Sequence, residues 1–180
     1  MSEAKPVIFL SHASDDKELA ELLAEQIRVM FGRDTVKVFV SSEPDAIGAG
    51  DKWFPTILQQ LEEATALVVL LTPNSIDRRW VWFEIGYFWR KVETSEGRLY
   101  PLHTPSIKEI PHPLNELQAK SLKDREQLKT FASNLKDQFG FGEPNHFDTY
   151  AILTWVTKPS VIIGTHNLYT RRGKRAVPRS

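Results

Sequence analysis

The sequence contains no cysteine in its 180 residues. This absence excludes disulfides, cysteine-ligated zinc sites and a cysteine nucleophile, and it is compatible with a reducing compartment. Long apolar runs are missing too, since none approaches the roughly 20 residues that cross a bilayer. The apolar run at residues 7–10 is too short for the hydrophobic part of a signal peptide. We therefore expect a cytoplasmic protein that makes no membrane contact.

Closely spaced histidines are also missing. The five histidines stand at positions 12, 103, 112, 146 and 166. This spacing is not that of a metal site, so we expect no metal. We expect no bound cofactor either. The chain has no internal repeat, and its 41% hydrophobic and 26% charged residues are typical of one globular domain with at most a small appendage.

Net charge is zero overall, but the charges are unevenly distributed. Residues 158–180 hold six Lys or Arg and no acid, whereas residues 1–157 carry a net charge of −6. A basic end of this kind is a nucleic-acid or partner contact in some proteins and a solvated tail in others. We expect nucleic-acid contact only through this tail or through a fused sensor domain.

Apolar runs alternate with amphipathic stretches along most of the chain. Strands are predicted at residues 5–10, 36–40, 66–72, 99–103 and, as a short fifth, 117–122. Helices are predicted at residues 15–31, 53–64, 77–91 and 124–139. This order predicts a parallel sheet with helices on both faces. Ligands of such sheets bind beyond the carboxyl ends of the strands, which draws attention to the loops at 11–16, 41–52 and 72–79.

The helix predicted at 77–91 surrounds one acid with aromatic residues. Glu84 is the only acid between Asp77 and Glu93, among three tryptophans, two phenylalanines and a tyrosine, and Trp80 lies one turn before it. A carboxylate buried among aromatics has a raised pKa unless it is paired. Glu84 is therefore a candidate for catalysis, a structural acid held by a cation such as Arg79, or an acid that faces water through a gap.

Two of the loops carry weaker signals. Gly48 and Gly50 stand just before a predicted helix, where free N–H groups suit a phosphate, and Lys52 follows them. Ser11 and His12 follow the first strand, and a histidine at that edge is suited to contact a phosphate. Glycine-containing turns and single histidines are common without any ligand, so neither loop establishes a site alone.

Three segments, in this order, resemble the boxes of TIR (Toll/interleukin-1 receptor-like) domains. The first is IFLSHASDDKELAELLAEQI, and the second, VKVFVSSEPDAIGAGDKWFPTILQQLEEA, is similar to the second box with its BB loop. The third, ALVVLLTPNSIDRRWVWFEI, resembles the Trp-x-x-x-Glu helix of bacterial NAD+-cleaving members. The resemblance covers residues 5–141 and implies a flavodoxin-like α/β fold with a five-stranded parallel sheet. Residues 142–180 are left as an extension, a linker or the start of a second domain, with strand-like runs at 151–156 and 161–163.

The resemblance implies an enzyme that releases nicotinamide from NAD+. The motif glutamate is catalytic in such families, which implies Glu84 as the catalytic carboxylate and Trp80 as its neighbour. One acid is enough, because the nicotinamide ring of NAD+ already carries a positive charge and needs no proton from a second acid in order to leave. Aromatic faces hold such a cation, which indicates Trp80 and Phe9. The further substrate contacts implied are Ser11, His12, Gly48, Gly50 and Lys52.

The products implied are nicotinamide with ADP-ribose or a cyclic isomer, in a defence effector that is activated by TIR–TIR self-association. Ser75 stands five residues before Trp80 rather than close to it, so we assign it no role. Two alternatives stay open: a non-catalytic TIR scaffold, and a related nucleoside-processing enzyme such as a deoxyribosyltransferase, in which a glutamate serves as nucleophile. A phosphoacceptor receiver is rejected, because the third strand ends LLTPNS without an aspartate.

Overall fold

The structure is a computed structural model that describes residues 5–42, 53–141 and 146–158. Five strands form one sheet in the order β2-β1-β3-β4-β5, and every neighbouring pair is parallel. The strands are β1 (Val7–His12), β2 (Lys37–Ser42), β3 (Ala64–Leu71), β4 (Arg98–His103) and β5 (Lys120–Ser121). The predicted flavodoxin-like α/β fold with a five-stranded parallel sheet is confirmed.

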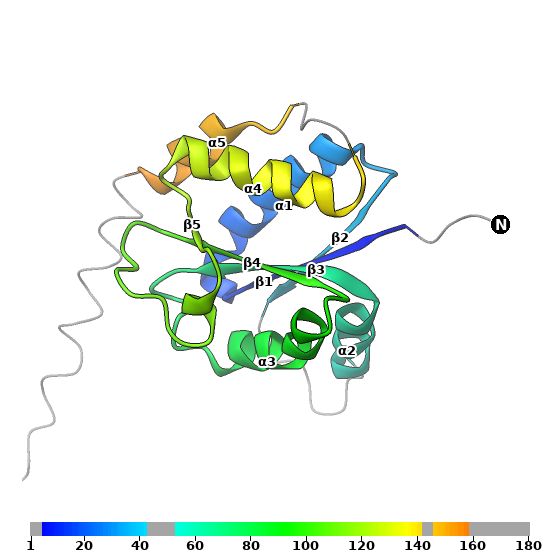
Figure 1. The fold of residues 1–180 in the computed structure, drawn as a ribbon. Coiled ribbons are helices and arrows are strands. Elements are labelled where there is room, and N and C mark those ends of the chain that lie inside the picture. The colour runs from blue at the N-terminus through cyan, green and yellow to red at the C-terminus, as the bar shows by residue number, and fades with distance from the viewer. Residues whose placement is uncertain (1–4, 43–52, 142–145, 159–180) are drawn as a thin grey trace, which may run out of the picture.

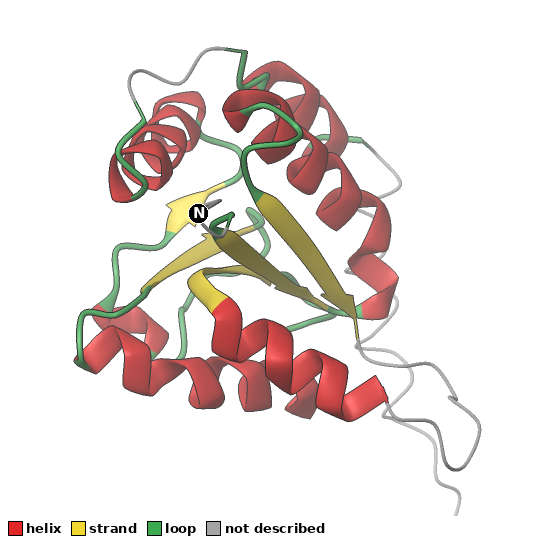
Figure 2. Ribbon diagram, turned by 90° about the vertical axis from the view of Figure 1, so that its right-hand side faces the viewer, coloured by secondary structure: helices red, strands yellow, loops and turns green. Residues whose placement is uncertain are grey.

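Helices cover both faces of this sheet (Figures 1 and 2). One face carries α1 (Lys17–Phe31), α4 (Arg125–Gln138) and α5 (Thr149–Val156), drawn above the sheet in Figure 1. The other face carries α2 (Trp53–Glu63) and α3 (Arg79–Glu93), drawn below it. Two short 3-10 helices, η1 (Ser14–Asp16) and η2 (Leu114–Glu116), lie in the connections. None of the described helices combines the length and the apolar character needed to cross a membrane.

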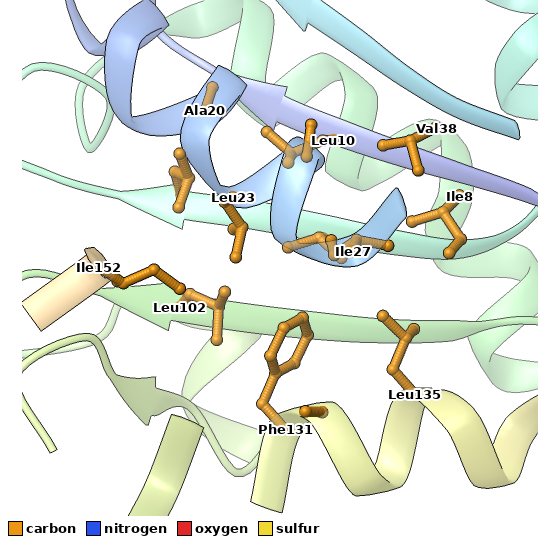
Figure 3. Packing of buried hydrophobic residues seen from close by; sticks show 14 of the residues in the cluster. Ile8, Leu10, Ala20, Leu23, Ile27, Val38, Leu102, Phe131, Leu135 and Ile152 are labelled. Carbon is orange, nitrogen blue, oxygen red and sulfur yellow. The ribbon is translucent and has the colours of Figure 1, made fainter. Parts of the chain in front are cut away.

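Alternation along β1 divides the core into two layers. Ile8 and Leu10 pack with α1 and α4, together with Phe131 and Leu135 (Figure 3). Phe9, between them, packs on the opposite face with α2 and α3. All six residues of β1 are buried, as are seven of the eight in β3, because a central parallel strand is covered on both faces. The same alternation determines on which face each site residue lies.

The segment TYAILTWV is a helix, so the strand predicted at 151–156 is wrong. Asp148 caps α5 by accepting hydrogen bonds from the backbone N–H groups of Tyr150 and Ala151. Ile152 and Val156, one helical turn apart, are buried against the α1 and α4 layer, which Figure 3 shows for Ile152. The N-cap and the four-residue spacing favour a helix over a strand. The other apolar run, 161–163, lies outside the described residues.

Several element boundaries differ from those predicted, those of α3 and β5 among them. α3 begins at Arg79 rather than at residue 77, because the preceding residues form a turn closed by hydrogen bonds from Ser75 and Arg78 backbone N–H groups. β5 is only two residues long, and it pairs with the last two residues of β4. Neither difference moves Glu84 off the face of α3 that meets the sheet.

Candidate active site at Glu84

Glu84 lies near the middle of α3, and its side chain is fully buried between the helix and the sheet. The Ser11 hydroxyl donates a hydrogen bond of 2.5 Å to Oε2, and the Ser41 hydroxyl donates one of 2.6 Å to Oε1. Both serines are themselves buried. Each oxygen of the carboxylate therefore has one hydroxyl donor, and the two donors come from different strands.

The strand register explains how two serines meet one carboxylate. Ser11 and Ser41 are paired residues of the parallel strands β1 and β2. Side chains of paired residues project from the same face, and alternation places this pair two positions after Phe9 and Phe39 on the α3 side. The two hydroxyls are therefore held side by side by the backbone ladder, opposite the helix that carries Glu84.

Burial raises the pKa of Glu84 to about 7. The hydrogen bonds from Ser11 and Ser41 oppose this shift, and so does the indole N–H of Trp80. That N–H is buried but makes no hydrogen bond of regular geometry to the described residues. No ion pair involves Glu84 within the described part of the chain, so no cation such as Arg79 holds the carboxylate there. The result is a carboxyl group that changes protonation near neutral pH.

Trp80 belongs to an aromatic cluster that runs across α2 and α3, which we term the aromatic ridge. Its members are Trp53, Phe54, Trp80, Phe83 and Tyr87. The Trp80 ring stacks on Phe83 at 5.1 Å between centroids and meets Trp53 edge-on at 4.9 Å. Phe54, Phe83 and Tyr87 are 40%, 37% and 40% exposed. The ridge therefore extends from beside Glu84 to the surface of the protein.

Phe9 does not present a face to a ligand, contrary to the sequence-based expectation. Its side chain is fully buried and packs against Phe39 at 5.2 Å between ring centroids. Its place two residues before Ser11 makes it part of the layer beneath the site. It supports the strand ends from which the serine hydroxyls project.

His12 is not brought to Glu84 either. β1 continues through His12, so alternation places this side chain on the α1 face, opposite Ser11. The imidazole is 1% exposed, and neither ring nitrogen makes a regular hydrogen bond to the described residues. Burial lowers its pKa to about 4, opposed in part by the backbone of Leu10 and Ser41. Gly48, Gly50 and Lys52, the other predicted contacts, lie outside the described residues.

A second polar cluster ties together the loops that follow β1 and β3. Thr72 donates to one carboxylate oxygen of Asp16 at 2.6 Å, and Asn74 donates to the other at 2.8 Å. Burial raises the pKa of Asp16, while these two hydrogen bonds lower it. Ser75 is buried and donates to the Leu70 carbonyl oxygen at 2.6 Å, which closes the turn before α3. This cluster fixes the connection through which α3 is placed over the sheet.

Ser41 is the functional candidate that the sequence analysis did not include. The pattern VKVFVSS alternates, so Phe39 and Ser41 share a face, and this signal was present in the sequence. The pairing of Ser41 with Ser11 needs the register between two strands, which the sequence does not supply. Trp53 and Phe54 were also not included, because they reach Trp80 from another helix. Among the described residues, no group of His, Asp or Glu side chains is arranged to hold a metal ion.

Comparison with known proteins gives one family. A family model described as the TIR domain matches residues 8–136. A solved TIR domain of the Toll-related receptor TRR-2 from Hydra magnipapillata is similar at 16% identity and a TM-score of 0.46, over 75% of this chain and 98% of that one. A LacI family regulator, CCPA from Weissella paramesenteroides with bound glucose, aligns at 7% identity and a TM-score of 0.38, over 83% of this chain and 52% of that one. No curated protein matches the sequence.

Proposed function

The chain belongs to the TIR domain family, and from this premise we propose that it is an NAD+ glycohydrolase or cyclase in which Glu84 acts on the nicotinamide–ribose bond. The observation that carries the proposal is the state of Glu84. It is a buried carboxyl group with a pKa raised to about 7, held by two neutral donors and flanked by Trp80. Strongly shifted carboxyl groups of this kind are more frequent at catalytic sites than elsewhere.

The chemistry that a lone carboxylate can supply matches this bond. Cleavage passes through an oxocarbenium-like ribose, and a nearby negative charge stabilises it as it forms. The nicotinamide of NAD+ carries a positive charge before cleavage and leaves as a neutral molecule, so no acid has to protonate it. Trp80 offers an aromatic face for that cationic ring, a contact worth about 0.5–2 kcal/mol. Glu84 and Trp80 together therefore supply the two interactions that the reaction needs most.

Glu84 can accept further hydrogen bonds without losing the serines. Each carboxylate oxygen has two lone pairs, and each serine hydroxyl occupies one of them. The second lone pair of each oxygen is suited to a ribose hydroxyl. The carboxylate is fully inaccessible in this structure, so substrate reaches it only after the side chains that cover it have moved.

A direct assay tests the proposal. The protein is incubated with NAD+ at high concentration, and the products are separated by chromatography against nicotinamide, ADP-ribose and cyclic ADP-ribose standards. We expect nicotinamide release from the native chain and none from a folded Glu84→Gln variant. Glu93→Gln is the matched control, because Glu93 is an exposed acid at the end of the same helix. Equal turnover by Glu84→Gln and the native chain refutes the catalytic assignment.

A non-catalytic TIR scaffold is the second candidate function. The observation that favours it is the exposed part of the aromatic ridge, since exposed aromatic side chains that lie together often mark contacts with other proteins. The same assay separates the two functions. A scaffold releases no nicotinamide at any concentration, even when light scattering shows that it has assembled.

A further inference from the structure

We propose that Ser41 is a positioning residue for Glu84, which acts with Ser11 to hold both carboxylate oxygens in a fixed orientation while leaving their negative charge intact. The consequence for turnover rests on the function proposed above. The consequence for the protonation of Glu84 does not, because it is a property of the folded chain. The two consequences can therefore be tested separately.

Geometry is the first argument for this role. The Ser41 hydroxyl contacts Oε1 at 2.6 Å while Ser11 contacts Oε2, so neither serine can replace the other. The side chain of a glutamate has three rotatable bonds, and one hydrogen bond would leave the plane of the carboxylate free to turn. Two donors on paired positions of adjacent strands remove that freedom, because the ladder fixes the spacing between them.

The neutral character of the donors is the second argument. No charged side chain among the described residues contributes to the pKa shift of Glu84, whether from α3 itself or from the strands it packs against. An arginine or lysine partner would orient the carboxylate but would also neutralise the charge that has to stabilise the ribosyl cation. Serine hydroxyls orient the group without a positive charge. The pair thus suits a carboxylate that must remain an unpaired anion.

Removal of the Ser41 hydroxyl has a predictable direction. In Ser41→Ala, Oε1 loses its donor inside a buried site, so the ionised form of Glu84 becomes less favourable and its pKa rises further. Loss of one hydrogen bond to a charged carboxylate typically raises its pKa by about one to two units. Ser41 itself touches no part of the substrate in this proposal, so KM for NAD+ should stay near that of the native chain. The loss should appear in kcat, and it should depend on pH.

The first experiment follows kcat and KM for NAD+ from about pH 5.5 to about pH 9.5. Ser41→Ala should lose roughly ten-fold or more in kcat near pH 7 and regain most of that loss at the alkaline end. Ser41→Thr keeps a hydroxyl at this strand position, so the midpoint of its kcat–pH profile should equal that of the native chain. Ser75→Ala is the matched control, since it removes a buried hydroxyl that donates to a backbone carbonyl instead. A native midpoint in Ser41→Ala, or a loss that is uniform across pH, overturns the proposal.

The second experiment does not use activity. Urea unfolding at several pH values is compared between Ser41→Ala and the same variant carrying Glu84→Gln, and the pH dependence of the difference reports the protonation of Glu84. We expect the midpoint of this pH dependence to lie at a higher pH than the midpoint obtained by comparing the native chain with Glu84→Gln. Ser41→Cys, with a weaker donor of similar size, should shift it in the same direction by less. Ser41→Cys also replaces Ser41→Ala in this experiment if the alanine variant does not fold.

The outcomes separate the two proposals. A native chain that releases no nicotinamide, yet shows the shifted midpoint in Ser41→Ala, refutes the enzymatic function and supports the positioning role. An active native chain whose Ser41 variants keep the native midpoint in both experiments refutes the positioning role alone.

Discussion

At the scale of single residues, Glu84 and His12 are buried on opposite faces of the sheet. Their contributions to the free energy of unfolding change with pH in opposite directions. Glu84 has a pKa raised from 4.5 to about 7, so the folded chain keeps a proton that the unfolded chain has lost. Stability from this group therefore falls as pH rises through that range. His12 has a pKa lowered from 6.5 to about 4, so its contribution rises with pH over a nearly matching range. The two slopes largely offset each other in the native chain.

Glu84→Gln should uncover the Glu84 contribution. The amide has nearly the same shape and no charge, so the variant does not lose stability when pH rises through 7. Its unfolding free energy relative to the native chain should increase by about 3 kcal/mol between pH 4.5 and the alkaline side of pH 7. Urea unfolding monitored by tryptophan fluorescence measures the difference. An offset between variant and native chain that does not change with pH contradicts the prediction.

His12→Gln should remove the His12 contribution to the pH dependence of the unfolding free energy, which is opposite in sign to that of Glu84. The stability that His12 contributes is lost as pH falls from 6.5 towards 4, because the imidazole gains a proton in the unfolded state but stays neutral when it is buried in the folded state. The variant has no such group, so its unfolding free energy relative to the native chain should rise by about 3 kcal/mol over that interval. His112→Gln, the same exchange at a mainly exposed histidine, is the control for the substitution itself. Identical acid slopes for His12→Gln and the native chain would show that His12 titrates normally.

At the scale of secondary-structure elements, the apolar runs of β1 and β3 allowed the sheet to be predicted from the sequence, because strands covered on both faces have few polar positions. Glu84 could be selected as a candidate, since one acid among aromatics on a helix is a local pattern, but its proposed catalytic role is what the family resemblance implies. Ser41 could not, because its role depends on the register of β2 against β1. His12 was grouped with Glu84 because β1 was predicted to end two residues too early. Once the strand includes His12, alternation separates it from Ser11.

The N-cap of α5 gives the prediction at this scale. Asp148 accepts hydrogen bonds from two backbone N–H groups at the start of the helix, and these groups have no partner within α5. Asp148→Ala should therefore lower the unfolding free energy by about 1 kcal/mol. Asp148→Asn keeps a capping oxygen and should cost less. Denaturant titration of the three proteins provides the measurement, and a native midpoint for Asp148→Ala would show that α5 does not depend on its cap.

At the scale of the whole molecule, α5 packs the described C-terminal segment against the helical layer formed by α1 and α4. Ile152 and Val156 are buried in the same cluster as residues of α1 and α4. A chain that ends at residue 141 should therefore expose apolar surface and unfold at a lower temperature than a chain that ends at residue 158 and keeps α5. Thermal unfolding of the two truncated chains tests this. Equal stability of the two would place the end of the folding unit before α5 instead.

Assembly is the property of the whole molecule on which activity should depend. A single chain buries Glu84 completely, so under the proposed function the side chains over it must move before NAD+ can bind. The family resemblance implies that neighbouring TIR domains complete one another's sites through the BB loop, predicted at Ser42–Lys52, of which residues 43–52 lie outside the described part. The exposed part of the aromatic ridge offers surface for such a neighbour.

If contact between copies stabilises the open state, specific activity should rise with protein concentration and with crowding agents. The measurement is nicotinamide release per molecule across a wide dilution series, with the oligomeric state followed by light scattering and Glu84→Gln as the inactive reference. Constant specific activity in protein that stays monomeric throughout would show that each chain opens its own site.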